Sequence, residues 1–130
     1  MHNWIEKLQL ERHVEGGYFS RSYQSEDAVI TVSDRYAISS DKQTTSTRSA
    51  GSAIYFLLEK QDFSAWHKLK SDEVWHFYTG DSAIKIHCLD ENGNYTQYSL
   101  GNPNLDSDAE FQVVVRAETW FAAELINKQG

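Results

Sequence analysis

The feature that most constrains this fold is a succession of short strand-like segments separated by turn residues, which begins after Gly17. Residues 53–58 are continuously apolar, and residues 83–89 alternate, with Ile84 and Ile86 on one side and Lys85 on the other. Such segments recur at a spacing of roughly 8–12 residues, which is typical of an all-β sandwich or barrel. Strands that alternate with helices are not indicated.

One segment has a helical pattern. Trp4, Ile5 and Leu8 fall on one face of a short amphipathic helix, and Asn3 is suited to cap its first turn. We therefore predict an N-terminal helix that ends near Leu10, with residues 1–12 forming the helix and the lead-in to the first strand.

A second segment lacks the apolar residues needed for a packed element. Residues 34–51 are crowded with Ser and Thr, and such a stretch buries too little apolar surface to offset its ordering entropy. We predict a flexible loop there. The 130 residues show no repeat and no composition break, so we expect a single domain that spans residues 1–130.

Charge and composition limit the classes of partner that this protein can bind. Twelve Lys and Arg face nineteen Asp and Glu, for a net charge of −7, whereas nucleic-acid binding depends on clustered positive charge. No window approaches the ~20 apolar residues of a membrane span. Cys88 is the only cysteine, so no disulfide can form within the chain. We expect a cytoplasmic protein that binds neither nucleic acid nor membrane.

The segment from His67 to Gly80 (HKLKSDEVWHFYTG) carries the clearest motif. Its spacing resembles the first motif of the cupin superfamily, which has a His, a second His two residues on, a Glu three or four residues later, and a Gly after six more. His67, Glu73 and Gly80 match that motif, and Leu69 stands at the place of the second His.

The resemblance extends to most of the chain. HVEGGYFSRSY near the start, SAIYFLL, the motif segment and the VVVRAETWFAAEL tail are similar to the small single-cupin family of uncharacterised function. The resemblance implies a single cupin-type jelly-roll β-barrel. Members of that family continue with a strand that ends in a Pro-Gly-Phe turn, whereas this chain stops in a turn after INKQG. We therefore expect one or more C-terminal strands to be missing.

The candidate site follows from strand alternation. Alternate residues of a strand share a face, so Glu73, Trp75 and Phe77 face the same way, and His67 can meet Glu73 across a hairpin inside the barrel. Burial there would raise the pKa of Glu73. The expected pocket is lined by apolar and aromatic side chains, namely Leu69, Trp75, Phe77, Trp120 and Phe121.

A metal is the usual cupin cofactor, and the donor set argues against one here. A site for a first-row metal requires three or four N, O or S ligands. Leu69 and Phe121 stand where the family pattern places histidines, which leaves only His67 and Glu73 as candidate ligands. We expect no bound metal and no other cofactor.

Three functions remain open. The first is an epimerase or isomerase similar to the metal-free sugar-nucleotide epimerases of the rhamnose pathway, with His67 as base, Glu73 orienting it and Tyr55 as acid. The second is a non-catalytic protein that binds a small molecule, such as a sugar or sugar nucleotide, in the barrel. The third is a metal-dependent cupin enzyme that uses His67, Glu73 and a further ligand. A homodimer is expected in each case, because an exposed sheet edge risks aggregation.

The run from His13 to Tyr18 has two interpretations. Gly16 and Gly17 permit a tight turn or a close backbone approach. Alternatively, Glu15 reaches over the barrel mouth together with Arg21 or Tyr23.

Overall fold

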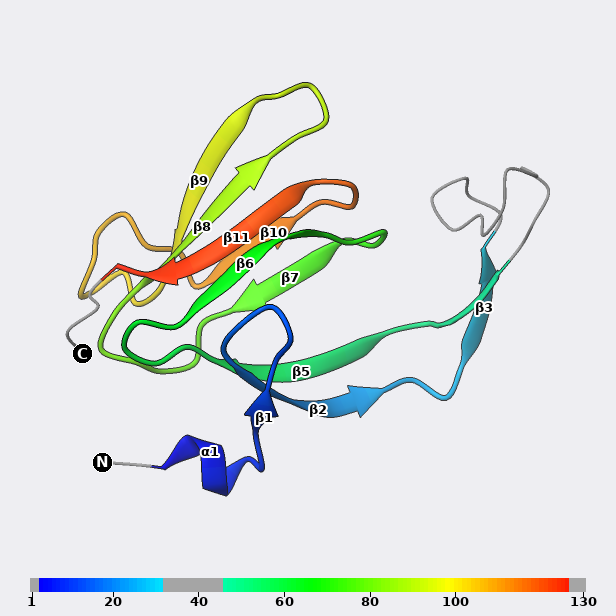
Figure 1. Ribbon diagram of the computed structural model, residues 1–130, viewed down its shortest axis with the longest axis horizontal. Coiled ribbons are helices and arrows are strands. Elements are labelled where there is room, and N and C mark those ends of the chain that lie inside the picture. Colours follow the sequence, from blue (N-terminus) through cyan, green and yellow to red (C-terminus); the bar gives the residue numbers. More distant parts are fainter. Residues whose placement is uncertain (1–2, 32–45, 127–130) are drawn as a thin grey trace. The chain divides into compact units, whose positions relative to one another are not determined.

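The computed structural model describes residues 3–31 and 46–126, whose regular secondary structure is almost entirely β-strand (Figure 1). In chain order the elements are α1 (Trp4–Lys7), β1 (Glu11–Arg12), β2 (Tyr18–Gln24), β3 (Ala28–Thr31), β4 (Ser46–Ser49), β5 (Ser52–Leu57), β6 (Phe63–Lys68), β7 (Glu73–His76), β8 (Ile84–Leu89), β9 (Tyr95–Leu100), β10 (Gln112–Val115) and β11 (Trp120–Leu125). The predicted all-β class with a short N-terminal helix is confirmed.

The described residues cluster into two compact units. The first unit is drawn from Met1–Glu11 and Phe19–Phe56, and the second from Arg12–Tyr18 and Leu57–Gly130. Each unit is described by itself below, and the prediction of a single domain stays a prediction.

In the first unit, α1 is shorter than predicted. The Asn3 side chain accepts a hydrogen bond from the backbone N–H of Glu6 at 3.2 Å, as expected of an N-cap. The helix ends at Lys7 rather than near Leu10, because the backbone of Gln9 takes a left-handed conformation with φ of 55°. That conformation cannot continue an α-helix.

The strands of the first unit include a ribbon that the sequence did not predict. β3 and β4 pair antiparallel, with Ala28 opposite Ser49 and Val29 opposite Arg48. The predicted loop at 34–51 is therefore wrong at its C-terminal end, where the Ser- and Thr-rich segment finds a strand partner. Residues 34–45 lie outside the described residues. β2 and β5 are neighbours in a sheet of order β1-β2-β5.

The second unit contains a four-stranded sheet of order β6-β11-β8-β9 and a two-stranded ribbon of β7 and β10. Residues 111–115 and 119–125 are consecutive strand-like segments, but they do not pair with each other. β10 pairs with β7, whereas β11 lies between β6 and β8 (Figure 1). The connection between them, with Glu118 at a φ of 65°, carries the chain from the ribbon to the sheet.

The core of the second unit lies on one face of this four-stranded sheet. The register places Phe121 opposite Cys88 and Ala123 opposite Ile86. Phe121 and Ile86 are the largest fully buried side chains among the described residues. Val113 and Val115 of β10 are also buried, so the ribbon contributes its own apolar face to the core.

β8 and β9 form a hairpin whose connection is longer than the turn that an Asn-Gly pair favours. Ile84 to Leu89 pair with Leu100 to Tyr95 in unbroken register. The connection runs from Asp90 to Asn94. The Asp90 carboxylate accepts backbone N–H bonds from Asn92 and Asn94 at 2.9 and 2.8 Å, which fixes the longer loop.

These bonds make the stability of the hairpin depend on pH. The backbone N–H of Asn94, with further bonds from this loop, lowers the pKa of Asp90. A lowered pKa stabilises the fold above the ordinary value of about 3.9, and that contribution is lost as pH falls through the folded-state value. We therefore expect Asp90→Ala to lower the urea midpoint at pH 7 and to match the wild type at acid pH. Replacement of the adjacent exposed Glu91 by Ala is the control, and an equal loss there at pH 7 would contradict this account.

The run from Arg12 to Tyr18 forms a turn that packs on the start of β6. Gly16 N–H donates to the His13 carbonyl at 3.0 Å, and His13 N–H donates to the Gly17 carbonyl at 2.9 Å. A Cβ at Gly16 would lie 1.8 Å from the carbonyl oxygen of Phe63, and Gly16 has a φ of +113°. The close-approach interpretation of this glycine is thus supported.

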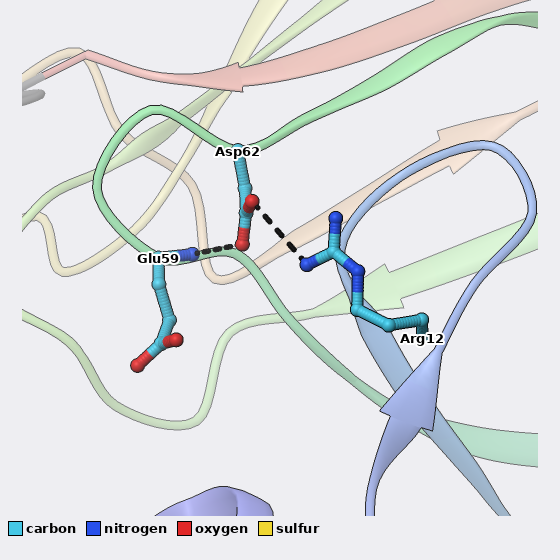
Figure 2. Close-up of polar contacts among 3 residues, drawn as sticks. All are labelled: Arg12, Glu59 and Asp62. Carbon is cyan, nitrogen blue, oxygen red and sulfur yellow. Dashed lines mark hydrogen bonds and ion pairs between the residues drawn. The ribbon is translucent and has the colours of Figure 1, made fainter.

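Arg12 contacts the turn that leads into β6 (Figure 2). Its guanidinium lies 3.5 Å from a carboxylate oxygen of Asp62, whose second oxygen accepts the Glu59 N–H at 3.1 Å. The Arg12 group also stacks over the Tyr18 ring at 4.5 Å. Arg12 is largely exposed, so the pair with Asp62 adds little stability, but it helps to hold the His13–Tyr18 run beside this turn.

No helix of the described segments has the length and apolar character needed to cross a membrane.

Candidate functional site

His67 reaches the core because β6 contains a bulge. Phe121 pairs with His67 and Ala123 pairs with Ser64, so three steps along β6 match two steps along β11. The extra residue reverses the alternation of β6 beyond Ser64. As a result, both Ser64 and His67 lie on the core face.

The His67 ring is held by two contacts. Its centroid lies 4.2 Å from that of Phe121, and Nδ1 lies 2.7 Å from the carbonyl oxygen of Ala65. A carbonyl oxygen only accepts hydrogen bonds, so Nδ1 carries a proton. In the neutral imidazole, Nε2 then has the lone pair and is the basic atom.

Glu73 approaches the same region from the two-stranded ribbon. It lies on β7 opposite Val115 of β10 and is half-buried. Burial raises the pKa of Glu73, while hydrogen bonding by the Trp75 side chain and the charge of His67 act in the opposite direction. The predicted direction of this shift is therefore supported by the structure.

The route by which His67 and Glu73 approach each other differs from the predicted one. β6 pairs with β11 and β7 pairs with β10, so these two residues do not face each other across a hairpin. Instead they come from the sheet and the ribbon, on either side of the core. Trp75 bridges the two layers, since its ring meets Phe121 edge-on at 6.4 Å between centroids.

The other predicted pocket residues are distributed more widely. Trp120 is 44% exposed and, as the neighbour of Phe121 on β11, lies on the opposite face, with the Lys68 ammonium 5.4 Å from its ring. Its assignment to the pocket is wrong, because adjacent strand residues point to opposite faces. Leu69 lies beyond the end of β6 and is exposed.

Phe77 lines a different hollow, and Tyr55 belongs to the other unit. Phe77 lines a hollow of about 140 Å³ with Gly80 and Leu105, which His67 and Glu73 do not line. Tyr55 lies on β5 in the first unit, and its catalytic role stays a prediction.

The donor set around His67 does not fit a metal ion. Within residues 3–31 and 46–126, no three His, Cys, Asp or Glu side chains come together as metal ligands. The ring of Phe121 packs against the imidazole of His67, and Phe121 offers no donor atom. Two donors fall short of the three or four that a first-row metal needs, so these residues do not form a first-row metal site.

Sequence reasoning missed the backbone support of this site. Ala65 lies in the bulge and makes bonds in two directions. Its N–H donates to the Glu15 carbonyl at 2.7 Å, and its carbonyl accepts the bond from His67. The glycine pair after Glu15 was the available signal, although its partner strand could not be read from the sequence.

The buried carboxyl of Glu73 leads to a stability prediction. A raised pKa means that folding disfavours the charged form, so stability is lost as pH rises from the ordinary value of about 4.3 through the folded-state value. We therefore expect Glu73→Gln to raise the urea midpoint at pH 7, with the gain disappearing near pH 4. Glu110→Gln, on an exposed side chain, is the control. A Glu73→Gln midpoint at or below the wild type at pH 7 would contradict this.

In the second unit the strands bring His67 and Glu73 to one core, and the comparisons place the chain in a family. Residues 2–130 match the family described as Cupin superfamily (DUF985). The chain belongs to this family, and the predicted cupin fold is confirmed.

Two solved structures are similar. Protein SO0799 from Shewanella oneidensis is 31% identical with a TM-score of 0.77, and the match covers 98% of this chain and 72% of that one. A hypothetical protein from Leishmania major is 25% identical with a TM-score of 0.75, covering 93% and 67%. Among curated proteins no match was found.

Proposed function

We propose that this cupin protein binds a small carbonyl compound in the core of the second unit and moves a proton on it, as an isomerase or epimerase does. The observation that carries the proposal is the bond from His67 Nδ1 to the Ala65 carbonyl. It fixes the ring and leaves Nε2 as the base. Such a positioned base contributes roughly 10²–10⁴-fold to a proton transfer.

Glu73 supplies the complementary acid. Because burial raises its pKa, more of this carboxyl is protonated near neutral pH than in an exposed glutamate. Nε2 of His67 takes a proton from the carbon next to the substrate carbonyl. The C–H electron pair forms the C=C bond of an enol, and the carbonyl oxygen takes the Glu73 proton. Return of a proton to carbon completes the isomerisation and needs no oxidant or cofactor.

The substrate class we propose is a keto-sugar or its nucleotide derivative. These compounds carry the required proton beside a carbonyl, and their ring can pack on the half-buried Trp75 side chain, as ligands do in aromatic pockets. This mechanism also predicts that the rate of isomerisation falls as pH rises through the pKa of Glu73, because Glu73 then loses the proton that it donates.

Deuterium exchange tests the first step directly. The wild-type protein in D₂O should exchange the proton next to the carbonyl of a substrate in a panel of keto-sugars and nucleotide keto-sugars, as followed by NMR. His67→Ala should slow exchange by about 10²-fold or more, and Glu73→Gln should slow it as well. His76→Ala, on the exposed face of β7, should leave the rate unchanged.

An unchanged exchange rate in His67→Ala, or no exchange with any compound, would contradict the catalytic proposal. The alternative is a protein that binds the compound without changing it. The close packing of the His67 ring on Phe121 favours this alternative. That alternative predicts that a keto-sugar raises the melting temperature of both the wild type and Glu73→Gln without any exchange.

A further inference from the structure

The outer face of the four-stranded sheet carries a second polar cluster, away from the His67 site. His87 of β8 lies on the face opposite to Cys88. Its Nδ1 is 2.6 Å from the Tyr95 hydroxyl, and its Nε2 is 2.8 Å from Glu124 Oε2. Three neighbouring strands, β8, β9 and β11, bring these groups together, which the sequence alone did not show.

The partners of His87 determine which group donates each hydrogen bond in this cluster. The Glu124 carboxylate only accepts, so in the neutral imidazole Nε2–H donates to it. Nδ1 therefore accepts the hydrogen of the Tyr95 hydroxyl. The Tyr95 oxygen keeps its lone pairs as acceptors for a further group, because its own hydrogen is committed to His87.

A hollow of about 490 Å³ lies beside this cluster. Its floor includes the small side chain of Ala122, and its walls include Trp66 and Phe63, which are 48% and 58% exposed. The Trp66 and His87 rings lie 6.4 Å apart. A small side chain beneath large aromatic ones opens the space between them, and the volume of the hollow is in the range of ligand pockets, about 300–1,000 Å³.

The chemistry of the hollow selects its ligand. The walls are mainly apolar and aromatic, with one polar corner at Tyr95, so a flat ring with a single polar end fits better than a sugar with many hydroxyls. The Glu124 carboxylate and the net charge of −7 disfavour an anion. A neutral phenol meets each requirement, because its ring packs on Trp66 and its O–H donates to the Tyr95 oxygen.

We propose that this outer hollow is a binding site for neutral phenolic compounds, with Tyr95 as the hydrogen-bond acceptor oriented by His87 and Glu124. The site is separate from the proposed proton-transfer site and does not depend on it.

Calorimetric titration at pH 7 tests the proposal with 2-naphthol as the probe. We expect one 2-naphthol per chain. We expect 2-methoxynaphthalene, which lacks the donor, to bind about three- to tenfold more weakly, as the loss of one hydrogen bond implies. The anion 2-naphthoate should bind more weakly than 2-naphthol.

Variants locate the site. Ala122→Leu fills the floor and should abolish binding, and Trp66→Ala should weaken it by about tenfold or more, as the loss of an aromatic contact implies. Tyr95→Phe should reduce 2-naphthol to the affinity of the methoxy compound. Leu105→Ala, on an exposed side chain elsewhere, is the matched control for folding and affinity.

His67→Ala separates this site from the core. It should leave 2-naphthol binding unchanged, whatever its effect on proton exchange. Three results would overturn the proposal: no binding to the wild type, binding that His67→Ala abolishes while Ala122→Leu retains it, or a hollow covered by a second copy of the chain, detected as a dimer that Trp66→Ala dissociates.

Discussion

Phe121→Ala is expected to lower the free energy of unfolding by about 3–5 kcal/mol, the cost typical of removing a buried phenyl ring. Phe121 is 1% exposed, lies on β11, the strand between β6 and β8, and contacts both the His67 ring and Trp75. The cost combines lost burial with the cavity that rigid neighbours leave open. Urea unfolding followed by circular dichroism measures it.

The matched control makes the same change on an exposed ring. Phe111 is 56% exposed, so Phe111→Ala should cost about 0.5 kcal/mol or less. Equal losses in the two variants would show that the β6–β11–β8 face is not the core. Phe121→Leu keeps most of the volume and should recover much of the stability, which guards against a variant too unstable to measure.

Gly16→Ala is the second large effect, with an expected loss of about 2–5 kcal/mol. A left-handed backbone costs an L-residue roughly 1–2 kcal/mol, and displacing a packed neighbour typically costs about 1–3 kcal/mol more. Here the neighbour is the Phe63 carbonyl, 1.8 Å from the added Cβ. Backbone in a paired strand cannot move aside as a flexible side chain can.

Gly93→Ala separates the cost of the left-handed backbone from the cost of displacing a packed neighbour. Gly93 also has a positive φ, +83°, but nothing lies within 4 Å of an added Cβ. Only the backbone term of about 1–2 kcal/mol should remain. Similar losses at both glycines would contradict the close-approach argument. Because the Glu15 carbonyl accepts from Ala65, Gly16→Ala should also change the ¹⁵N chemical shifts of the His67 ring, and Gly93→Ala should not.

Much of the fold could be predicted because its signals are local. The alternation of Ile84, Ile86 and Cys88 against Lys85 and His87 reappears in the register of β8 and in the burial of one side. The same alternation contradicts the joint placement of Trp120 and Phe121 in one pocket. The period of a strand separates such neighbours, and that conflict was visible in the sequence.

Partner choice could not be predicted from these signals. β10 and β11 are separated by a short polar connection that looks like a hairpin turn, yet each pairs with a strand distant in sequence. Strand pairing over such distances depends on the packing of the whole core. The identity of His67 and Glu73 came from their spacing, whereas the bond from His67 to Ala65 depends on a backbone irregularity that no residue type marks.

The bulge in β6 changes which side chains of this strand point outward. Up to Ser64 the odd-numbered side chains point outward, and after the bulge the even-numbered ones do, so Trp66 faces the outer hollow while His67 faces the core. Deleting Ala65 would leave Trp66 and His67 on their present, opposite faces, because neighbouring residues of a regular strand alternate. The deletion would instead remove the carbonyl that accepts the bond from His67 Nδ1 and the N–H that donates to Glu15. The inserted residue thus serves as the backbone support of the imidazole, and its deletion is expected to slow proton exchange at His67 while the outer hollow still binds 2-naphthol.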